Sequence, residues 1–313
     1  MALLLPIFLV FVGLVISGKG APITCPSTED LRPCTCQRVS YGLEVMCAKF
    51  NTSSHLLRAF RILRDYNVNT ILLHGLYINE VLPADLFDGM KVSAIRVEKS
   101  KLMFSRPAFS GLDPWLHVLN VAQDSFVRSE ERFSLAKLTK LNELIVQKIH
   151  LDRVEDKWLN EKVPNVHKVD LDFNDIGLLE DHAFANLQSL TFISVAENRI
   201  KVIKRSMFPN PALKLTRIDL SYNEISYLPE DFFVGMPSLK EIIFPGNDLK
   251  SLHEATWTPV WEQLSQIILS ENSIDCDNSI KWIKKYREPR QLAGTCVLPK
   301  SLTGHNIKDL YDA

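Results

Sequence analysis

Residues 215–236, LTRIDLSYNEISYLPEDFFVGM, carry the pattern that decides the fold. Five residues of this stretch have a fixed spacing, at positions 1, 4, 6, 9 and 11: Leu215, Ile218, Leu220, Asn223 and Ile225. The alternation of polar and apolar residues around Ile218 and Leu220 predicts a short strand with one buried face. Because Asn223 follows directly, we expect the chain to turn there.

The same spacing recurs along most of the chain. Copies begin every 24 or 25 residues, at Val68, Val92, Leu116, Leu141, Val166, Leu190, Leu215, Leu239 and Leu264. Positions 1, 4, 6 and 11 are apolar in all nine copies, although only 46% of the chain is hydrophobic. One copy cannot bury its own apolar face, so this period predicts a solenoid whose coils cover one another.

The spacing L-x-x-L-x-L-x-x-N-x-L resembles that of leucine-rich-repeat proteins, and the resemblance covers residues 68–274. It implies an α/β repeat solenoid, the leucine-rich-repeat horseshoe, with a parallel sheet on the concave side and loops or short helices on the convex side. An aromatic column is expected on the convex side: Phe87, Phe109, Phe133, Trp158, Phe184, Phe208, Phe233 and Trp257.

Position 9 divides the solenoid into two halves. The last five copies have an asparagine there: Asn174, Asn198, Asn223, Asn247 and Asn272. The first four have other residues: Leu76, Ser100, Asp124 and Ile149. A buried amide can bond backbone groups that a turn leaves unpaired. We therefore expect a less regular ladder in the N-terminal half.

All six cysteines lie outside the repeats: Cys25, Cys34, Cys36, Cys47, Cys276 and Cys296. In an exported chain they predict three disulfides. Residues 21–67 and 275–313 are thus expected to be caps that cover the two open ends of the solenoid. The first four cysteines allow three pairings, and a metal site is the disfavoured alternative because C-x-x-C spacing is absent.

The two caps resemble those of extracellular leucine-rich-repeat proteins. The core Cys34-Thr35-Cys36 matches the N-terminal cap, and that resemblance implies the pairs Cys25–Cys36 and Cys34–Cys47. At the other end, Cys276, Trp282 and Cys296 match the C-terminal cap, which implies the pair Cys276–Cys296.

Two segments indicate export. Residues 1–20, MALLLPIFLVFVGLVISGKG, predict a signal peptide cleaved before Ala21, with a retained anchor as the alternative. No later apolar run reaches 18 residues, so no membrane span is expected.

The sequence contains one N-glycosylation sequon, Asn51-Thr52-Ser53, which predicts a glycan on Asn51; an unmodified polar loop is the alternative.

The composition offers little for catalysis or for polyanions. A net charge of −1 leaves no basic excess for nucleic acid or an anionic membrane. No nucleophile, phosphate-binding or zinc-hydrolase motif occurs, so we expect neither enzyme activity nor a cofactor. Asp170, Asp172 and Asp219 share the concave face, but Ca²⁺ needs six or more oxygens, so we expect them to balance Lys168 and Arg217.

Strand alternation places a candidate binding surface on the concave side of repeats five to seven. Its residues are Lys168, Asp170, Phe173, Phe192, Arg217, Asp219 and Tyr222. Aromatic residues ringed by charges suit a protein-binding hot spot. For Phe173 and Tyr222, at position 8, the alternative is packing beside the turn.

The expected function is that of a secreted, extracellular, non-catalytic protein that binds another protein through its concave face. Recognition of a glycan or microbial surface, and support of a secreted enzyme as a non-catalytic subunit, are the alternatives. The chain also resembles secreted arthropod leucine-rich-repeat proteins similar to the non-catalytic subunit of oplophorus-luciferin 2-monooxygenase. The resemblance rests on the segment CPSTEDLRPCTC, the nine repeats and a C-terminal cap that has only two cysteines. That resemblance implies a companion subunit and no luciferase activity in this chain.

Overall fold

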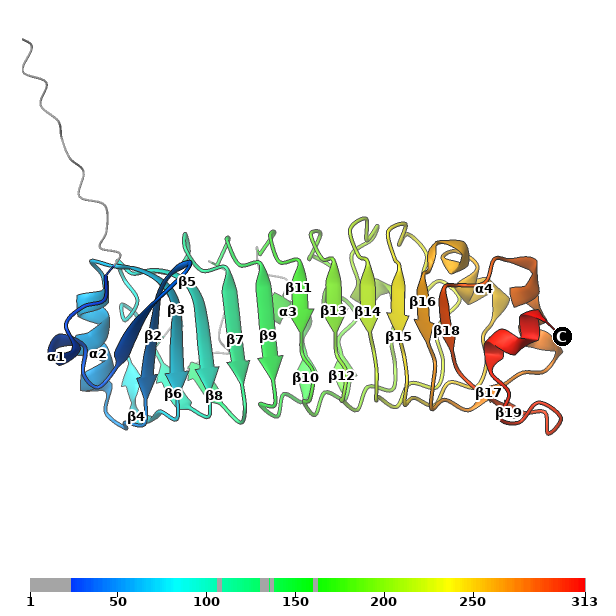
Figure 1. Ribbon diagram of the computed structural model, residues 1–313, viewed down its shortest axis with the longest axis horizontal. Helices are drawn as coiled ribbons and strands as arrows, with labels where there is room; N and C mark the ends of the chain where they lie inside the picture. Colours follow the sequence, from blue (N-terminus) through cyan, green and yellow to red (C-terminus); the bar gives the residue numbers. More distant parts are fainter. Residues whose placement is uncertain (1–23, 106–108, 130–134, 136–137, 160–162, 313) are drawn as a thin grey trace, which may run out of the picture.

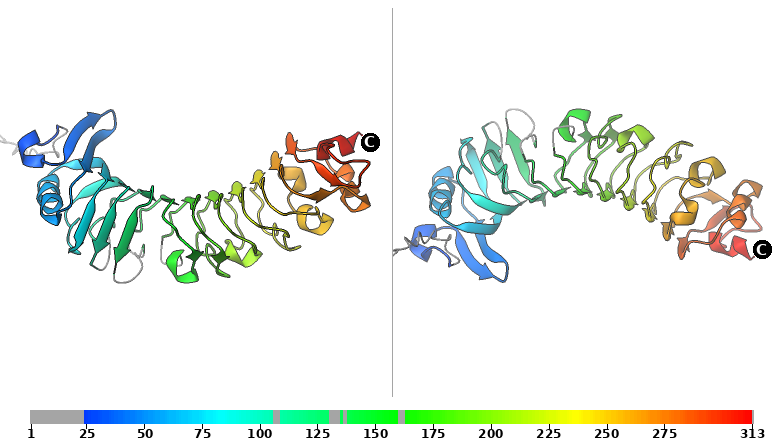
Figure 2. Two further views of the ribbon diagram at one scale, coloured as in Figure 1. Left: turned by 90° about the horizontal axis from the view of Figure 1, so that it is seen from below. Right: turned by 90° about the horizontal axis from the view of Figure 1, so that it is seen from above.

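The computed structural model describes residues 24–105, 109–129, 135, 138–159 and 163–312. The coils stack side by side into an open arc with one cap at each end (Figures 1 and 2). The predicted signal peptide and Phe133 lie outside the described residues. Within them, no helix has both the length and the apolar character needed to cross a bilayer.

A single twelve-stranded sheet runs along the concave side of the arc, which confirms the predicted solenoid (Figure 2). Its strands, in spatial order, are β1 (Thr35–Val39), β2 (Gly42–Ala48), β3 (Asn67–His74), β5 (Lys91–Glu98), β7 (Val118–Ala122), β9 (Glu143–Gln147), β11 (Lys168–Asp170), β13 (Phe192–Ser194), β14 (Arg217–Asp219), β15 (Glu241–Ile243), β16 (Gln266–Ile268) and β18 (Gln291–Ala293). Only the β1–β2 pair is antiparallel.

The remaining elements lie on the returning part of the coils and in the caps. Three short parallel sheets contain β4 (Tyr77–Leu82), β6 (Lys101–Phe104) and β8 (Phe126–Ser129); β10 (Arg153–Val154) and β12 (Leu178–Leu179); and β17 (Ile274–Asp275) and β19 (Cys296–Leu298). The helices are α1 (Thr28–Leu31), α2 (Ser53–Leu63), α3 (Asp156–Leu159) and α4 (Glu254–Trp257), with 3₁₀ turns η1 (Arg205–Met207), η2 (Trp261–Gln263), η3 (Asn278–Lys285) and η4 (Ile307–Tyr311).

The apolar positions form the core almost as predicted. Every residue at positions 1, 4 and 6 of the nine repeats is buried. Position 11 departs from the prediction in the third repeat, where Phe126 is 42% exposed. The turn before it is one residue longer, with positive φ at both Gln123 and Asp124, so the next residues shift by one place. Val127 packs against the core instead of Phe126.

Aromatic rings form two files through the convex layer. One joins Phe60, Phe87, Phe104 and Phe109, with neighbouring centroids 5.3–6.2 Å apart. The other runs into the C-terminal cap through Phe184, Phe208, Phe232, Phe233, Trp257, Trp261, Trp282 and Tyr286. Contacts between these rings join each coil to the next on the convex side of the solenoid.

Three disulfides hold the caps: Cys25–Cys36, Cys34–Cys47 and Cys276–Cys296. These are the pairs that the resemblance implied. The N-terminal cap extends the sheet with the β1–β2 hairpin, in which Leu43, Val45 and Cys47 of β2 alternate as buried residues. The C-terminal cap also contributes a strand, because β18 pairs in parallel with β16, while η3 covers the last coil.

The expectation of a less regular ladder in the N-terminal half is wrong for the main strands, although the turn of the third repeat does depart from the common form. Strands β3 and β5 are eight residues long, whereas β11, β13, β14, β15 and β16 have three. In the second and third repeats a buried serine takes the place of the missing asparagine. The hydroxyl of Ser100 donates to Leu73 O and accepts from Leu76 N, and that of Ser125 donates to Val97 O and accepts from Ser100 N.

Candidate binding surface on the concave face

One row of side chains crosses the concave face at position 3 of five consecutive repeats. The sheet register places in line Glu143, Lys168, Phe192, Arg217 and Glu241, here called the Phe192 row. The Phe192 ring stands between two cations, with its centroid 5.8 Å from Lys168 Nζ and 5.6 Å from Arg217 Cζ. Each cation pairs outward with an acid, Lys168 Nζ with Glu143 Oε2 at 3.6 Å and Arg217 Nη1 with Glu241 Oε2 at 3.1 Å.

The Phe192 row is held together by weak contacts. All five side chains are partly exposed. Ion pairs of this kind contribute about 0.2–1 kcal/mol each, and an exposed cation–π contact contributes about 0.5–1 kcal/mol. A partner can therefore rearrange these contacts at little cost and cover the ring. Two acids and two cations cancel, so the row presents alternating rather than net charge.

The nearby aspartates have a structural role that the sequence analysis missed. From β11 on, each main strand ends at position 5, and the amide of the position-9 asparagine bonds the position-6 carbonyl of the preceding coil. Because the strand does not continue past position 5, the backbone N–H at position 7 has no backbone carbonyl as a partner. In three successive coils a carboxylate accepts this N–H: Asp170 from Asp172 (3.3 Å), Asp172 from Ala196 (2.7 Å) and Asp219 from Ser221 (3.1 Å).

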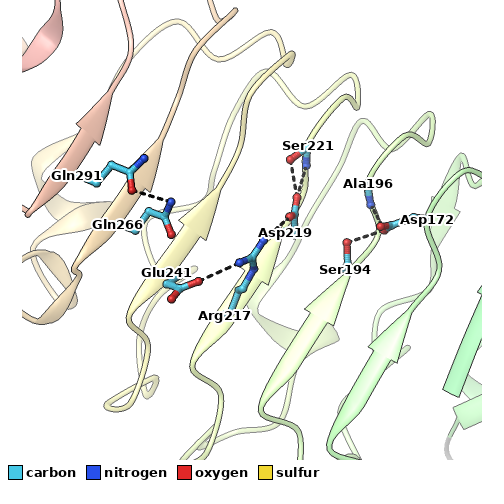
Figure 3. A network of polar contacts seen from close by, with 9 residues as sticks. All are labelled: Asp172, Ser194, Ala196, Arg217, Asp219, Ser221, Glu241, Gln266 and Gln291. Atoms are coloured by element: carbon cyan, nitrogen blue, oxygen red, sulfur yellow. Dashed lines mark hydrogen bonds and ion pairs between the residues drawn. The ribbon is translucent and has the colours of Figure 1, made fainter. Parts of the chain in front are cut away.

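Figure 3 shows two of these carboxylates, Asp172 and Asp219, together with Arg217 and Glu241 of the Phe192 row. Asp172 also accepts from the Ser194 hydroxyl at 2.5 Å, and Asp219 pairs with Arg217 Nη2 at 3.2 Å. Asp170 accepts in addition from Gln147 Nε2 at 2.8 Å. The next coil has Pro245 at position 7, which has no N–H to satisfy. These aspartates stabilise the ends of the strands, because buried N–H groups are costly to leave unpaired.

The carboxylate of Asp172 has an altered affinity for protons. Burial raises the pKa of Asp172 from its ordinary value of 3.8 to about 6. The negative charges of Asp170 and Asp219 also raise this pKa, whereas the hydrogen bonds from Ser194 and Ala196 lower it. The folded protein therefore binds a proton here more tightly than the unfolded chain does.

This pKa predicts a pH dependence of stability. A raised folded-state pKa gives stability that is complete below pH 3.8 and is lost as the pH rises through about 6. Because solvent still reaches the carboxylate, we expect a loss of about 1 kcal/mol rather than the full value of the shift. Asp172→Asn keeps an oxygen for Ala196 but cannot titrate. Urea unfolding at pH 4 and pH 7 should show the extra loss in the natural protein only; equal losses in both proteins would contradict the assignment.

Phe173 and Tyr222 lie apart from the Phe192 row. At position 8 they stand five residues farther along the coil than position 3, in the turn beyond the end of the strand. Phe173 is 46% exposed, with Lys148 Nζ 4.8 Å from its ring centroid. Tyr222 covers Gly246, where a Cβ would approach its Cδ1 to 2.3 Å, and its hydroxyl donates to Glu271 at 3.4 Å. The charge of Glu271 raises the pKa of Tyr222.

The structure thus divides the predicted surface into parts. Lys168, Phe192 and Arg217 come together, the aspartates support the strand ends, and the two position-8 aromatics border the turns. Glu143 and Glu241 complete the row but were not predicted, although aligning position 3 across the repeats would have revealed them. Among the described residues, no group of three or more His, Cys, Asp or Glu side chains is arranged to hold a metal ion.

The repeats of this chain are similar to those of known proteins. A family model described as leucine rich repeat matches residues 164–217 and 190–249. No curated protein matches the chain, so the similarity to the luciferin-monooxygenase subunit stays a hypothesis.

Two solved structures share the fold at low sequence identity. The TLR13 chain of a TLR13–ssRNA13 complex aligns with a TM-score of 0.51 and 18% identity over 76% of this chain. This chain spans only 38% of that protein. An internalin from Listeria monocytogenes aligns with a TM-score of 0.54 and 17% identity, covering 81% of this chain and 67% of the internalin. The chain therefore contains leucine-rich repeats and has the leucine-rich-repeat fold.

Proposed function

We propose that this chain is an exported, non-catalytic leucine-rich-repeat protein that binds another protein through the Phe192 row. The observation that carries the proposal is the Phe192 ring between Lys168 and Arg217 on the concave sheet. Binding hot spots are enriched in aromatic residues and arginine, surrounded by contacts that exclude water. The row has this composition on a regular, concave sheet.

The charges around Phe192 favour a protein over a polyanion. Lys168 and Arg217 are already paired with Glu143 and Glu241, so the row offers no net positive charge to phosphates or sulfates. A protein surface with its own alternating charges can replace these pairs one for one. The strands that carry the row are each paired on both sides, so the side chains would provide the recognition.

The disulfides support export. No free cysteine occurs among the described residues, and disulfides persist mainly in oxidising compartments. Asn51 is exposed in the loop before α2, as attachment of a glycan requires. The signal peptide predicted over residues 1–20 is consistent with this location.

The proposal also assigns no catalytic step to the chain. Asp172 is the concave acid whose pKa is raised to about 6, but its carboxylate is engaged by Ser194 and Ala196. A nucleophile would need a base and a stabilised position for developing charge beside it. Instead, the arrangement around Asp172 completes the hydrogen bonding of a strand end.

The test begins with affinity purification of the secreted protein from its native fluid and identification of the protein that stays bound. Phe192→Ala combined with Arg217→Ala should weaken binding of that partner about 100-fold, because two hot-spot side chains contribute about 3 kcal/mol together. Calorimetry would measure the affinity. Tyr227→Ala is the matched control, since this exposed tyrosine lies away from the row.

The thermal midpoint of the double variant should stay close to that of the natural protein, because both side chains are partly exposed. Unchanged affinity in a folded double variant would exclude the Phe192 row as the binding surface. If the partner copurifies with a catalytic activity, the chain is the non-catalytic subunit of an enzyme complex. If no protein is retained, recognition of a glycan or microbial surface becomes the leading alternative.

A further inference from the structure

We infer a second binding site, a pocket for a neutral oligosaccharide at the N-terminal end of the sheet. The pocket has a volume of about 440 Å³ and lies where the hairpin of the cap meets the first coils. Its lining includes Tyr41, Asn67, Asn69, Lys91, Ser93 and Trp115. In Figure 1 the hairpin turns at the upper edge of the sheet, near the starts of β3 and β5.

Two exposed aromatic rings form the sides of the pocket. Tyr41 is 66% exposed in the turn between β1 and β2, and Trp115 is 42% exposed just before β7. Lys91 Nζ lies 5.7 Å from the centroid of the Trp115 ring. Tyrosine and tryptophan combine an apolar face with a polar edge. Such a pair suits a ligand that has apolar faces and a polar rim.

Hydrogen-bonding groups without partners also line the pocket. The side chains of Asn67 and Ser93 make no hydrogen bond to any residue that the structure describes. Asn69 Nδ2 donates to Thr70 Oγ1 at 3.1 Å, which leaves the amide oxygen of Asn69 as an acceptor. The pocket therefore offers both hydrogen-bond donors and hydrogen-bond acceptors beside apolar surface. This is the usual composition of a small-ligand site.

The pocket is built on paired strands of the sheet. Its floor is built on β3 and β5, which with eight residues are the longest strands of the sheet. The hairpin is joined to this floor by the parallel pairing of β2 with β3. Gly42, with φ of 140°, allows the hairpin to approach Asn69, because a Cβ on Gly42 would come within 3.2 Å of Asn69 Cβ. A preformed site loses little entropy on binding.

The chemistry of the pocket favours a sugar over other ligands. A pyranose ring offers an apolar face to an aromatic side chain and hydroxyls that both donate and accept hydrogen bonds. A peptide added as an extra strand would need a free strand edge, but β2, β3 and β5 are each paired on both sides. Among the six polar and aromatic lining residues only Lys91 is charged, so the pocket lacks the clustered cations that bind phosphate or sulfate.

This site is independent of the proposed protein-binding function. The Phe192 row lies on β9 to β15, whereas the pocket is bounded by the N-terminal cap and the segments that start β3, β5 and β7. Variants of one site should leave binding at the other unchanged. Failure of one proposal is therefore distinguishable from failure of the other.

Tryptophan fluorescence provides a direct measurement. Trp115 is the exposed tryptophan, while Trp158, Trp257, Trp261 and Trp282 are at least 91% buried. We expect the emission to change on titration with at least one of cellohexaose, chitohexaose, laminarihexaose and mannohexaose, with a dissociation constant between about 10 μM and 1 mM. Trp115→Ala should abolish the emission change. In calorimetry, Tyr41→Ala should weaken the same hexaose at least tenfold, and Trp115→Phe should retain most of the affinity.

Tyr227→Ala is the control, because it removes another exposed tyrosine, 56% against 66% for Tyr41, that does not line the pocket. Unchanged circular dichroism would show that each variant is folded. The proposal is overturned if none of the four hexaoses binds at 5 mM. It is overturned equally if a hexaose binds but Trp115→Ala and Tyr41→Ala bind it as well as the natural protein does.

Discussion

Asn198→Ala is expected to lower the free energy of unfolding by about 3 kcal/mol, one of the two largest effects of a single substitution that we expect in this chain. The side chain is buried, and its Oδ1 accepts from Ile176 N at 3.0 Å. Its Nδ2 donates to the carbonyls of Leu171, Val195 and Ala196 at 2.9–3.0 Å. Alanine leaves one N–H and three carbonyls without this partner in the interior of the turn.

Equilibrium urea unfolding, followed by circular dichroism, would measure the effect of Asn198→Ala. Asn278→Ala is the matched control, because Asn278 is exposed and its substitution should change stability by less than about 0.5 kcal/mol. Asn198→Ser should fall between them, since Ser100 and Ser125 show that a hydroxyl can bond two of these backbone groups. Equal stabilities of Asn198→Ala and Asn278→Ala would contradict the role given to the asparagine ladder.

The fold could be predicted from the sequence because its signal is repeated. Positions 1, 4 and 6 face inward in every coil, and their apolar character recurs nine times. The failure at Phe126 has a local cause. A period of 24 or 25 residues does not reveal where in a turn the extra residue lies, and here the turn lengthens before Ser125. Ser125, one residue after position 9, therefore takes the structural place that asparagine has in the later repeats.

The candidate site was predictable only in part. Lys168, Phe192 and Arg217 follow from strand alternation, because position 3 points outward in each coil. The role of Asp172 does not follow, since it depends on where the strands end and which N–H groups lose their partners. The pocket joins Tyr41 of the cap to Trp115 before the third repeat, and no repeat spacing relates these two residues.

Trp282→Ala should have the other large effect, because it removes the side chain that seals the last coil. The indole is 3% exposed, and its ring centroid lies 4.8 Å from that of Trp261 and 5.9 Å from that of Tyr286. Its Nε1 donates to Leu252 O at 2.7 Å. Truncation of a buried tryptophan leaves a cavity and an unpaired carbonyl, so we expect a loss of about 4 kcal/mol.

Loss of the cap should also change the behaviour of the folded protein. An open solenoid end exposes an apolar cross-section, so Trp282→Ala should self-associate at concentrations where the natural protein does not. Thermal unfolding and light scattering would measure the two effects. Trp282→Phe keeps a ring against Trp261 but loses the bond to Leu252, and should cost about half as much. Trp115→Phe, at an exposed tryptophan, is the control that should leave both measurements unchanged. A stable, monomeric Trp282→Ala protein would show that the disulfide Cys276–Cys296 holds the C-terminal cap without help from the aromatic file.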